Sequence, residues 1–149
     1  GFLPRRAAAR MRLLASLRHD PRTLVFYEAP HRLIVTLGAM VSTFGEYRSA
    51  AIARELTKKF ESLYRGPLGD LYRRVVSDPS AVKGEIVIVI EGSNEDPDAV
   101  EATRVMEILL EEMDKKSAVR VAMALTGLSR NKLYRTANFH HGVDPDVEI

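Results

Sequence analysis

The sequence predicts an α/β domain followed by a small all-helical domain. Strand-like apolar runs alternate with amphipathic helical stretches as far as residue 92, whereas only helical periodicity follows. The charge also changes there: residues 1–92 hold 15 Lys and Arg against 9 Asp and Glu, and residues 93–149 hold 7 against 11. We therefore expect an α/β domain over residues 1–92, a helical domain over 93–141 and a flexible tail over 142–149.

The first part of the expected α/β domain reads as helix, strand, helix. Pro4 begins a helix that Asp20-Pro21 ends, and residues 23–27 form a short apolar strand. The arginines of this helix lie largely opposite its expected apolar face, which consists of Ala7, Met11, Leu14 and Leu17. Pro30 begins a second helix, which Gly45 ends. The expected buried stripe of this second helix is Leu33, Ile34, Leu37, Met40, Val41 and Phe44.

The second part of this domain adds three strands and a helix. Residues 47–54 read as a strand and 61–65 as a shorter one, after which Gly66-Pro67 is expected to break the chain. An amphipathic helix follows over residues 68–76. Residues 86–90 are five β-branched residues without a polar interruption, which predicts a strand covered on both faces.

The expected helical domain opens with an acidic helix. Residues 92–97 have the composition of a linker, and Asp98 with Glu101 three residues later resembles a capping box. The helix is expected to extend to about Met113.

Two short helices are expected after it, over residues 117–125 and 129–138. Met123, Gly127 and Leu133 match the spacing of a helix-turn-helix, although Met stands where a small residue is usual. Residues 115–141 hold six Lys and Arg and no acid. Such a block is either a solvated helix face or a surface that binds nucleic acid.

Composition excludes several classes of protein. The absence of cysteine excludes a disulfide scaffold, a thiolate metal site and a Cys nucleophile, and it fits a cytoplasmic protein. No apolar run approaches the length of a membrane span, and we find no phosphate-binding glycine loop. His140-His141 lack the i, i+4 spacing of a helical metal pair, so no metal site is expected.

Ionisable residues gather where the expected strands begin or end. They are Glu28, His31 and Arg32 after the first strand, Arg54, Glu55 and Lys58 after the second, and Lys83-Gly84-Glu85 and Glu91-Gly92 on either side of the last. This pattern predicts one polar site built from neighbouring strands. The alternative is that these side chains only cap helices or form surface ion pairs.

Several sequence blocks, in order, resemble one enzyme family. They are Gly1-Phe2-Leu3-Pro4, Phe26 to Arg32, Ala53 to Lys58 with Glu61, Lys83-Gly84-Glu85 through Glu91-Gly92, and Lys132-Leu133-Tyr134. Together they are similar to the ribosomal RNA small subunit methyltransferase I family, within the tetrapyrrole methylase superfamily. The resemblance covers essentially the whole chain, but it includes none of the family's N-terminal domain with its loops for S-adenosylmethionine (SAM).

The resemblance implies the second α/β domain of a tetrapyrrole-methylase-like fold and a helix-turn-helix-like C-terminal domain. It implies 2′-O-methylation of a cytidine ribose in 16S ribosomal RNA, with SAM as donor, by the full-length enzyme. This chain alone is expected to be inactive, because SAM binds between two α/β domains in the family. The expected partners are small-subunit rRNA or the ribosomal subunit, with no membrane, and a homodimer is also considered.

Site residues follow by position in the family's fold. The cofactor-binding candidates are Tyr27, Glu28, Arg54, Glu55, Leu56, Thr57, Lys83, Gly84 and Glu85. The candidates for a catalytic base are Glu28, His31, Glu55 and Lys58, and nothing in the sequence selects among them. The RNA-binding candidates are Arg32, Arg54, Lys115, Lys116, Arg120, Arg130, Lys132 and Arg135. Two alternatives stay open: a methylase of corrin or porphyrin precursors, and a nucleic-acid-binding module without catalysis.

Overall fold

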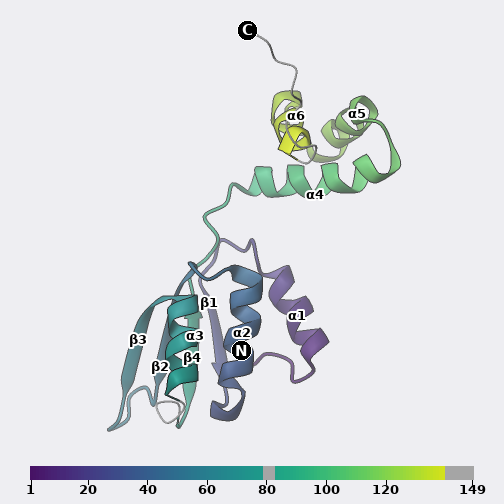
Figure 1. Ribbon diagram of the computed structural model, residues 1–149. Helices are drawn as coiled ribbons and strands as arrows, with labels where there is room; N and C mark the ends of the chain where they lie inside the picture. Colours follow the sequence, from purple (N-terminus) through teal and green to yellow (C-terminus); the bar gives the residue numbers. More distant parts are fainter. Residues whose placement is uncertain (79–82, 140–149) are drawn as a thin grey trace. The chain divides into compact units, whose positions relative to one another are not determined.

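The chain forms two compact units, which are described separately. The computed structural model describes residues 1–78 and 83–139, so the expected tail over 142–149 and His140-His141 lie outside the described residues (Figure 1). The first unit spans Gly1–Asn94 and is called the α/β unit; the second spans Glu95–Ile149 and is called the helical unit. The expected fold class, an α/β domain followed by a helical domain, is confirmed.

The α/β unit alternates helices and strands as its sequence periodicity predicts. Its elements are α1 (Ala7–Ser16), β1 (Leu24–Glu28), the short 3-10 helix η1 (Pro30–Arg32), α2 (Leu33–Phe44), β2 (Ser49–Arg54), β3 (Ser62–Pro67), α3 (Leu68–Ser77) and β4 (Ile86–Ile90). The four strands form one sheet in the order β1-β4-β2-β3, and every pairing in it is antiparallel. The last strand made, β4, therefore occupies the middle of the sheet.

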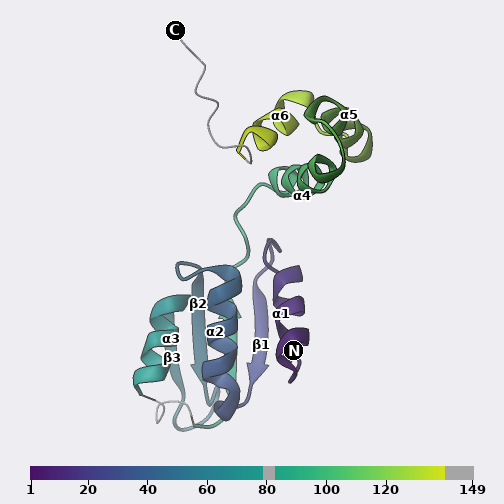
Figure 2. The same cartoon turned by 45° about the vertical axis from the view of Figure 1, so that its right-hand side comes forward.

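One face of this sheet is covered by helices. Figures 1 and 2 show α1, α2 and α3 on the same side of the strands. The core lies between these layers and includes Leu14, Leu37, Ile52 and Ile88, all of which are fully buried. Alternate residues of each strand supply this face, as expected for a pleated strand.

The other face of the sheet carries apolar side chains that the unit itself leaves partly open. No helix among residues 1–78 and 83–94 covers it, so the expectation that β4 is covered on both faces is wrong for this chain. Val25, Tyr27 and Leu63 are exposed on this face, and Val87 and Val89 are half-buried. We call it the open face.

The N-terminal helix differs from its predicted orientation. Met11, expected in the core, is exposed, whereas Arg10 is buried with 6% of its surface accessible. Leu14 and Arg10 are the buried residues of α1. Apolar spacing alone missed this, because a long arginine stem can fill apolar space while its guanidinium reaches a polar one.

Gly66-Pro67 also departs from the prediction. These residues do not break the chain but form the last two positions of β3, opposite Ala50 and Ser49. Because β3 is at the edge of the sheet, a proline there removes no ladder hydrogen bond on the solvent side. Leu68 begins α3 directly afterwards.

The helical unit consists of three helices around its own small core. They are α4 (Pro97–Glu112), α5 (Lys115–Thr126) and α6 (Arg130–Phe139). Its core residues are Ala102, Val105, Met106, Ala118, Val119, Ala122 and Leu133. The turn between α5 and α6 contains Gly127 at φ 71°, a left-handed conformation that glycine adopts without strain.

The predicted cap of α4 is displaced by two residues. The Asp96 side chain, not Asp98, caps the helix by accepting a hydrogen bond from the Asp98 N–H, at 3.0 Å. Pro97 occupies the first helical position, where its missing N–H has no cost. Glu101 pairs with Arg104 instead of forming a capping box.

Candidate functional site

The antiparallel sheet brings three of the predicted polar segments together at one end of its strands. Glu28 ends β1 and Arg54 ends β2, and both lie opposite Ile86, the first residue of β4. Lys83-Gly84-Glu85 therefore enters the sheet where the other two segments leave it. Glu91-Gly92 follows the other end of β4 and does not lie with these three segments.

A pocket of about 400 Å³ lies at this end of the strands, and we call it the edge pocket. Its lining residues are Phe2, Tyr27, Glu28, Ala29, Pro30, Leu56, Gly84, Glu85, Ile86 and Val87. The volume is within the range of small-molecule sites, and the lining is mainly apolar and aromatic with backbone from a glycine. This composition suits a flat heteroaromatic ligand better than a strongly charged one.

The β2–β3 loop forms one wall of the edge pocket and is fixed by Glu55. The Glu55 carboxylate accepts a hydrogen bond from the Glu85 N–H, at 2.6 Å, and from Lys58 Nζ, at 3.3 Å. The hydrogen bond from the Glu85 N–H is the larger cause, and the one from Lys58 the smaller, that holds the pKa of Glu55 below its usual value. Glu55 and Thr57 have positive φ values of 50° and 65°, which are uncommon for residues other than glycine. The Glu55 contacts and a hydrogen bond from the Thr57 N–H to the Glu61 carboxylate, at 2.7 Å, hold the loop in this conformation.

Gly84 is required by the same contact. Its φ is +94°, and a β-carbon there would collide with the Glu55 carboxylate. The glycine therefore permits close approach of the Glu55 carboxylate.

Lys58 and Arg54 are both engaged within the loop. Lys58 Nζ lies 3.1 Å from a carboxylate oxygen of Glu85, and the carboxylates of Glu85 and Glu55 raise the Lys58 pKa. Arg54 donates to Ser62 Oγ, at 3.0 Å, and to the Phe60 carbonyl, at 3.5 Å. Lys58 thus stays protonated, and Arg54 anchors the loop.

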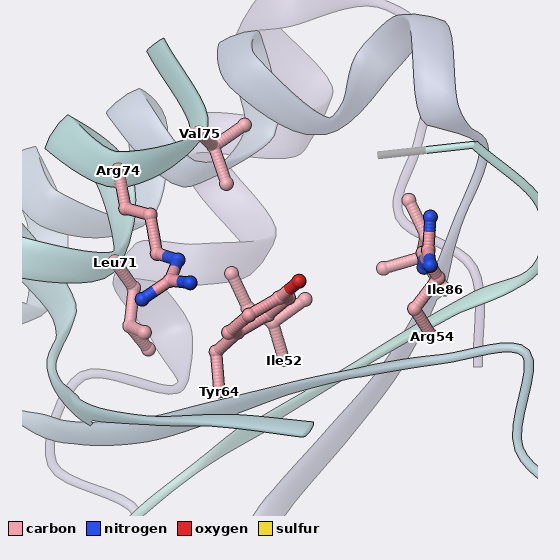
Figure 3. Close-up of a pocket in the computed structure, with 7 residues that line it drawn as sticks. All are labelled: Ile52, Arg54, Tyr64, Leu71, Arg74, Val75 and Ile86. Atoms are coloured by element: carbon pink, nitrogen blue, oxygen red, sulfur yellow. The ribbon is translucent and has the colours of Figure 1, made fainter. Parts of the chain in front are cut away.

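Arg54 also borders a narrow crevice beneath α3. Figure 3 shows it beside Ile86, while the Arg74 guanidinium lies over the Tyr64 ring, 4.2 Å from the ring centroid. The crevice holds about 10 Å³, the space of a single water molecule, so no cofactor fits there.

A second pocket of about 690 Å³ shares Phe2, Glu28 and Ala29 with the edge pocket, and we call it the arginine pocket. Its other lining residues are Leu3, Arg5, Arg10, His31, Arg32 and Val35. Two pockets joined by common residues allow a larger substrate to contact both at once.

Glu28 stands between these pockets and is almost fully buried, with 3% of its surface accessible. Its carboxylate accepts hydrogen bonds from Thr36 Oγ1, at 2.6 Å, and from the Ala29 N–H, at 2.8 Å. Arg32 Nη2 lies 3.4 Å from it and also donates to the Leu3 and Pro4 carbonyls. Glu28 therefore connects β1, α2 and the N-terminal segment.

The basic residues of the helical unit have different surroundings. Lys116, Arg120 and Arg130 line a shallow pocket of about 490 Å³, and Lys115 and Arg130 lie over the Tyr134 ring. Arg135 is exposed.

Lys132, by contrast, is held by acids of its own unit. Its Nζ lies 2.8 Å from Asp96 and 2.8 Å from Asp98, which raise its pKa. The six predicted RNA-binding residues of this unit therefore do not form one uniform surface.

The structure brings together five of the nine predicted cofactor-binding residues: Tyr27, Glu28, Leu56, Gly84 and Glu85. Arg54, Glu55, Thr57 and Lys83 do not line the edge pocket. Sequence reasoning missed Phe2, which forms a parallel bridge to Tyr27 with ring centroids 5.6 Å apart. An exposed aromatic residue in the Gly1–Pro4 block was the available signal.

The described residues contain neither a cluster of metal ligands nor a helix that could span a membrane. Across residues 1–78 and 83–139, no three His, Cys, Asp or Glu side chains cluster as metal ligands would. No helix in the described part of the chain has the length and apolar character needed to cross a membrane.

Comparison with known proteins identifies the relatives of this chain. Residues 96–138 match the family described as "RsmI C-terminal HTH domain". A protein of Pseudomonas aeruginosa named "Ribosomal RNA small subunit methyltransferase I" is 43% identical over 141 residues, covering 92% of this chain and 50% of the relative. Proteins of the same name from Xylella fastidiosa (strain 9a5c) and Escherichia coli O157:H7 are 43% and 37% identical, covering 90% and 92% of this chain and 50% and 49% of each relative.

These matches extend through both units of the chain. The chain spans about half the length of the curated relatives it matches. It belongs to the ribosomal RNA small subunit methyltransferase I family.

Proposed function

We propose that this chain supplies one wall of the SAM and RNA cleft of a methyltransferase that acts on the 2′-hydroxyl of a cytidine ribose in 16S rRNA. The observation that supports this most is the edge pocket, where β1, the β2–β3 loop and the start of β4 meet. The names of its relatives give the class of reaction and substrate. The enzyme acts in the cytoplasm on the small subunit, and the chain alone is inactive.

The residues of the edge pocket fit the methyl donor. Tyr27, Leu56 and Val87 offer apolar contact for an adenine ring, and the backbone of Gly84 lies at the pocket wall. SAM, when bound, supplies a methyl group on a sulfonium sulfur. The chain's contribution to rate is mainly orientation of the acceptor hydroxyl toward that methyl group.

Of the four candidate bases, His31 is the one we assign to accept the ribose proton. Glu28 is occupied by Thr36 and the Ala29 N–H, Glu55 holds the loop, and Lys58 is kept protonated. His31 is exposed in the arginine pocket, and no described residue hydrogen-bonds to its imidazole. An imidazole can take up and release a proton under physiological conditions, which suits a general base.

The donor site is tested by calorimetric titration with SAM, using the chain and a form completed to the length of its relatives. Leu56→Asp in the completed form is expected to weaken SAM binding at least about tenfold, because a carboxylate would lose solvation beside the ligand. Leu13→Asp is the matched control, since Leu13 is 38% exposed on α1 and Leu56 is 42% exposed. The chain alone should bind SAM weakly or not at all. Lack of binding by the completed parent would overturn the donor site and favour a nucleic-acid-binding module.

The proton acceptor is tested by methyl transfer to small-subunit rRNA. His31→Ala in the completed form is expected to lower kcat about 100-fold, the usual range for a general base, with SAM affinity unchanged. His19→Ala, at an exposed position outside both pockets, should leave kcat unchanged. Equal rates for the two variants would show that the base lies elsewhere.

A further inference from the structure

The arginine pocket contains more positive charge than its own residues neutralise. Arg5, Arg10 and Arg32 line it together with His31, and Glu28 is its one acidic residue. Glu28 already accepts from Thr36 Oγ1 and the Ala29 N–H and contacts only Arg32 among the arginines. Even with Glu28 counted, at least two guanidinium charges remain uncompensated.

Arg10 is the least compensated of these cations. It is buried to 94% of its surface, and its Nε has no hydrogen-bond partner. Its Nη1 donates to the Arg5 carbonyl at 3.3 Å, and no carboxylate of residues 1–78 or 83–139 lies within ion-pairing distance. A buried charge without a counter-ion is costly, so such positions are typical of binding sites.

The backbone adds to the same positive field. Arg5 lies just before α1, whose first turn contains no acidic residue and whose N-terminus has no side-chain cap. The positive end of a helix dipole therefore lies beside the arginine pocket.

From this arrangement we infer that the arginine pocket binds a phosphodiester group of the substrate RNA, through Arg5 and Arg10 with Arg32. The inference rests on the proposed function and adds a position for the RNA backbone. A phosphodiester next to the reacting ribose would lie within a few ångströms of its 2′-hydroxyl. Because the two pockets share Glu28, Ala29 and Phe2, this would place the hydroxyl near both His31 and the edge pocket.

A single protein carboxylate is the other group that could neutralise Arg10. It accounts for the pocket less well, because one carboxylate would leave a second arginine unpaired and would not need a volume of about 690 Å³. A polyanion supplies several charges and fits a set of planar, multidentate donors.

The test measures binding of a short single-stranded RNA by fluorescence anisotropy over a salt series, using the completed form. Arg10→Met is expected to bind about tenfold more weakly, with a salt slope lower by roughly 0.7, the value for one phosphate contact on a single strand. The melting temperature should stay the same or rise, because methionine keeps the apolar stem and removes a buried charge. Arg12→Met, at an exposed position on the same helix, is the matched control with little effect on either.

The other possible results distinguish a phosphate site from a protein carboxylate that pairs with Arg10. Equal RNA affinity for the Arg10 and Arg12 variants, with SAM binding intact, overturns the phosphate site and leaves the proposed function standing. A lower melting temperature for Arg10→Met with unchanged RNA affinity identifies a protein carboxylate as the partner and also overturns it. If Arg10→Met does not fold, Arg5→Met, at an exposed position, must show the same loss of affinity and salt slope.

Discussion

Gly92→Ala is expected to destabilise the α/β unit strongly, although it adds only one methyl group. A β-carbon at residue 92 would overlap the carbonyl of Pro21, and the Arg22 carbonyl lies 2.9 Å away. These are backbone atoms, held nearby by the 2.7 Å hydrogen bond from the Ser93 N–H to the Asp20 carbonyl. Overpacking that side-chain rotation cannot relieve costs about 3 kcal/mol or more, which for a unit of this size lowers Tm by roughly 12 °C or more.

Gly38→Ala is the control for this experiment and should have the opposite sign. Gly38 lies within α2, and a β-carbon there would make an ordinary contact with the Tyr72 ring at 3.6 Å. Replacing a helical glycine with alanine stabilises a helix by about 0.5–1 kcal/mol. Urea denaturation of both variants gives the comparison. A Gly92→Ala protein as stable as its parent would show that the 20–22 segment does not pack against the end of β4.

Glu28→Ala is expected to cost about 3–5 kcal/mol, the usual penalty for removing one partner of a buried charged pair. The Thr36 hydroxyl and the Ala29 N–H would lose their acceptor, and Arg32 would lose its carboxylate. The change would also leave the cations of the arginine pocket without any acid. Denaturant unfolding of the 149-residue chain measures the loss.

Two further variants separate this structural role from a catalytic one. Glu46→Ala removes an exposed pair with Arg73 and should cost about 0–1 kcal/mol. Glu28→Gln keeps an acceptor for Thr36 and should recover much of the stability lost in Glu28→Ala. If Glu28→Gln in the form completed to the length of its relatives instead abolished methyl transfer without any loss of stability, Glu28 would be the base and the assignment of His31 would be wrong.

The order of helices and strands was predictable because each segment is short and strongly periodic. Ile86–Ile90 and the apolar stripe of α2 lie where the sequence places them, and Gly45 ends α2 at φ 88°. Periodicity identifies which residues alternate or repeat, and local end signals such as glycine add the boundaries.

The sequence could not show which surfaces meet other surfaces. Arg10 is buried although its residue type is usually exposed, because the fold brings residues 28–35 of the arginine pocket against the start of α1. Ile86–Ile90 reads as covered on both faces because its residues are uniformly β-branched, and the open face explains why that reading was wrong.

The candidate site was predictable in its segments and not in its side-chain contacts. Charged residues at the ends of β1 and β2 marked the correct end of the sheet, since the antiparallel strand between them, β4, begins where they end. Whether Glu55 faced a ligand or Gly84 depended on loop conformation, including the positive φ of Glu55, which residue spacing does not report.

The central position of β4 also determines when the sheet can form as the chain is made. Before Ile86–Ile90 has been synthesised, β2 and β3 are the only two of the four described strands that can pair with each other, and β1 has no antiparallel partner. A lone hairpin is marginally stable in water. The α/β unit should thus acquire its structure late and in one cooperative step. Synthesis of the residues that follow β4 moves this strand out of the ribosome, so that it can insert between β1 and β2.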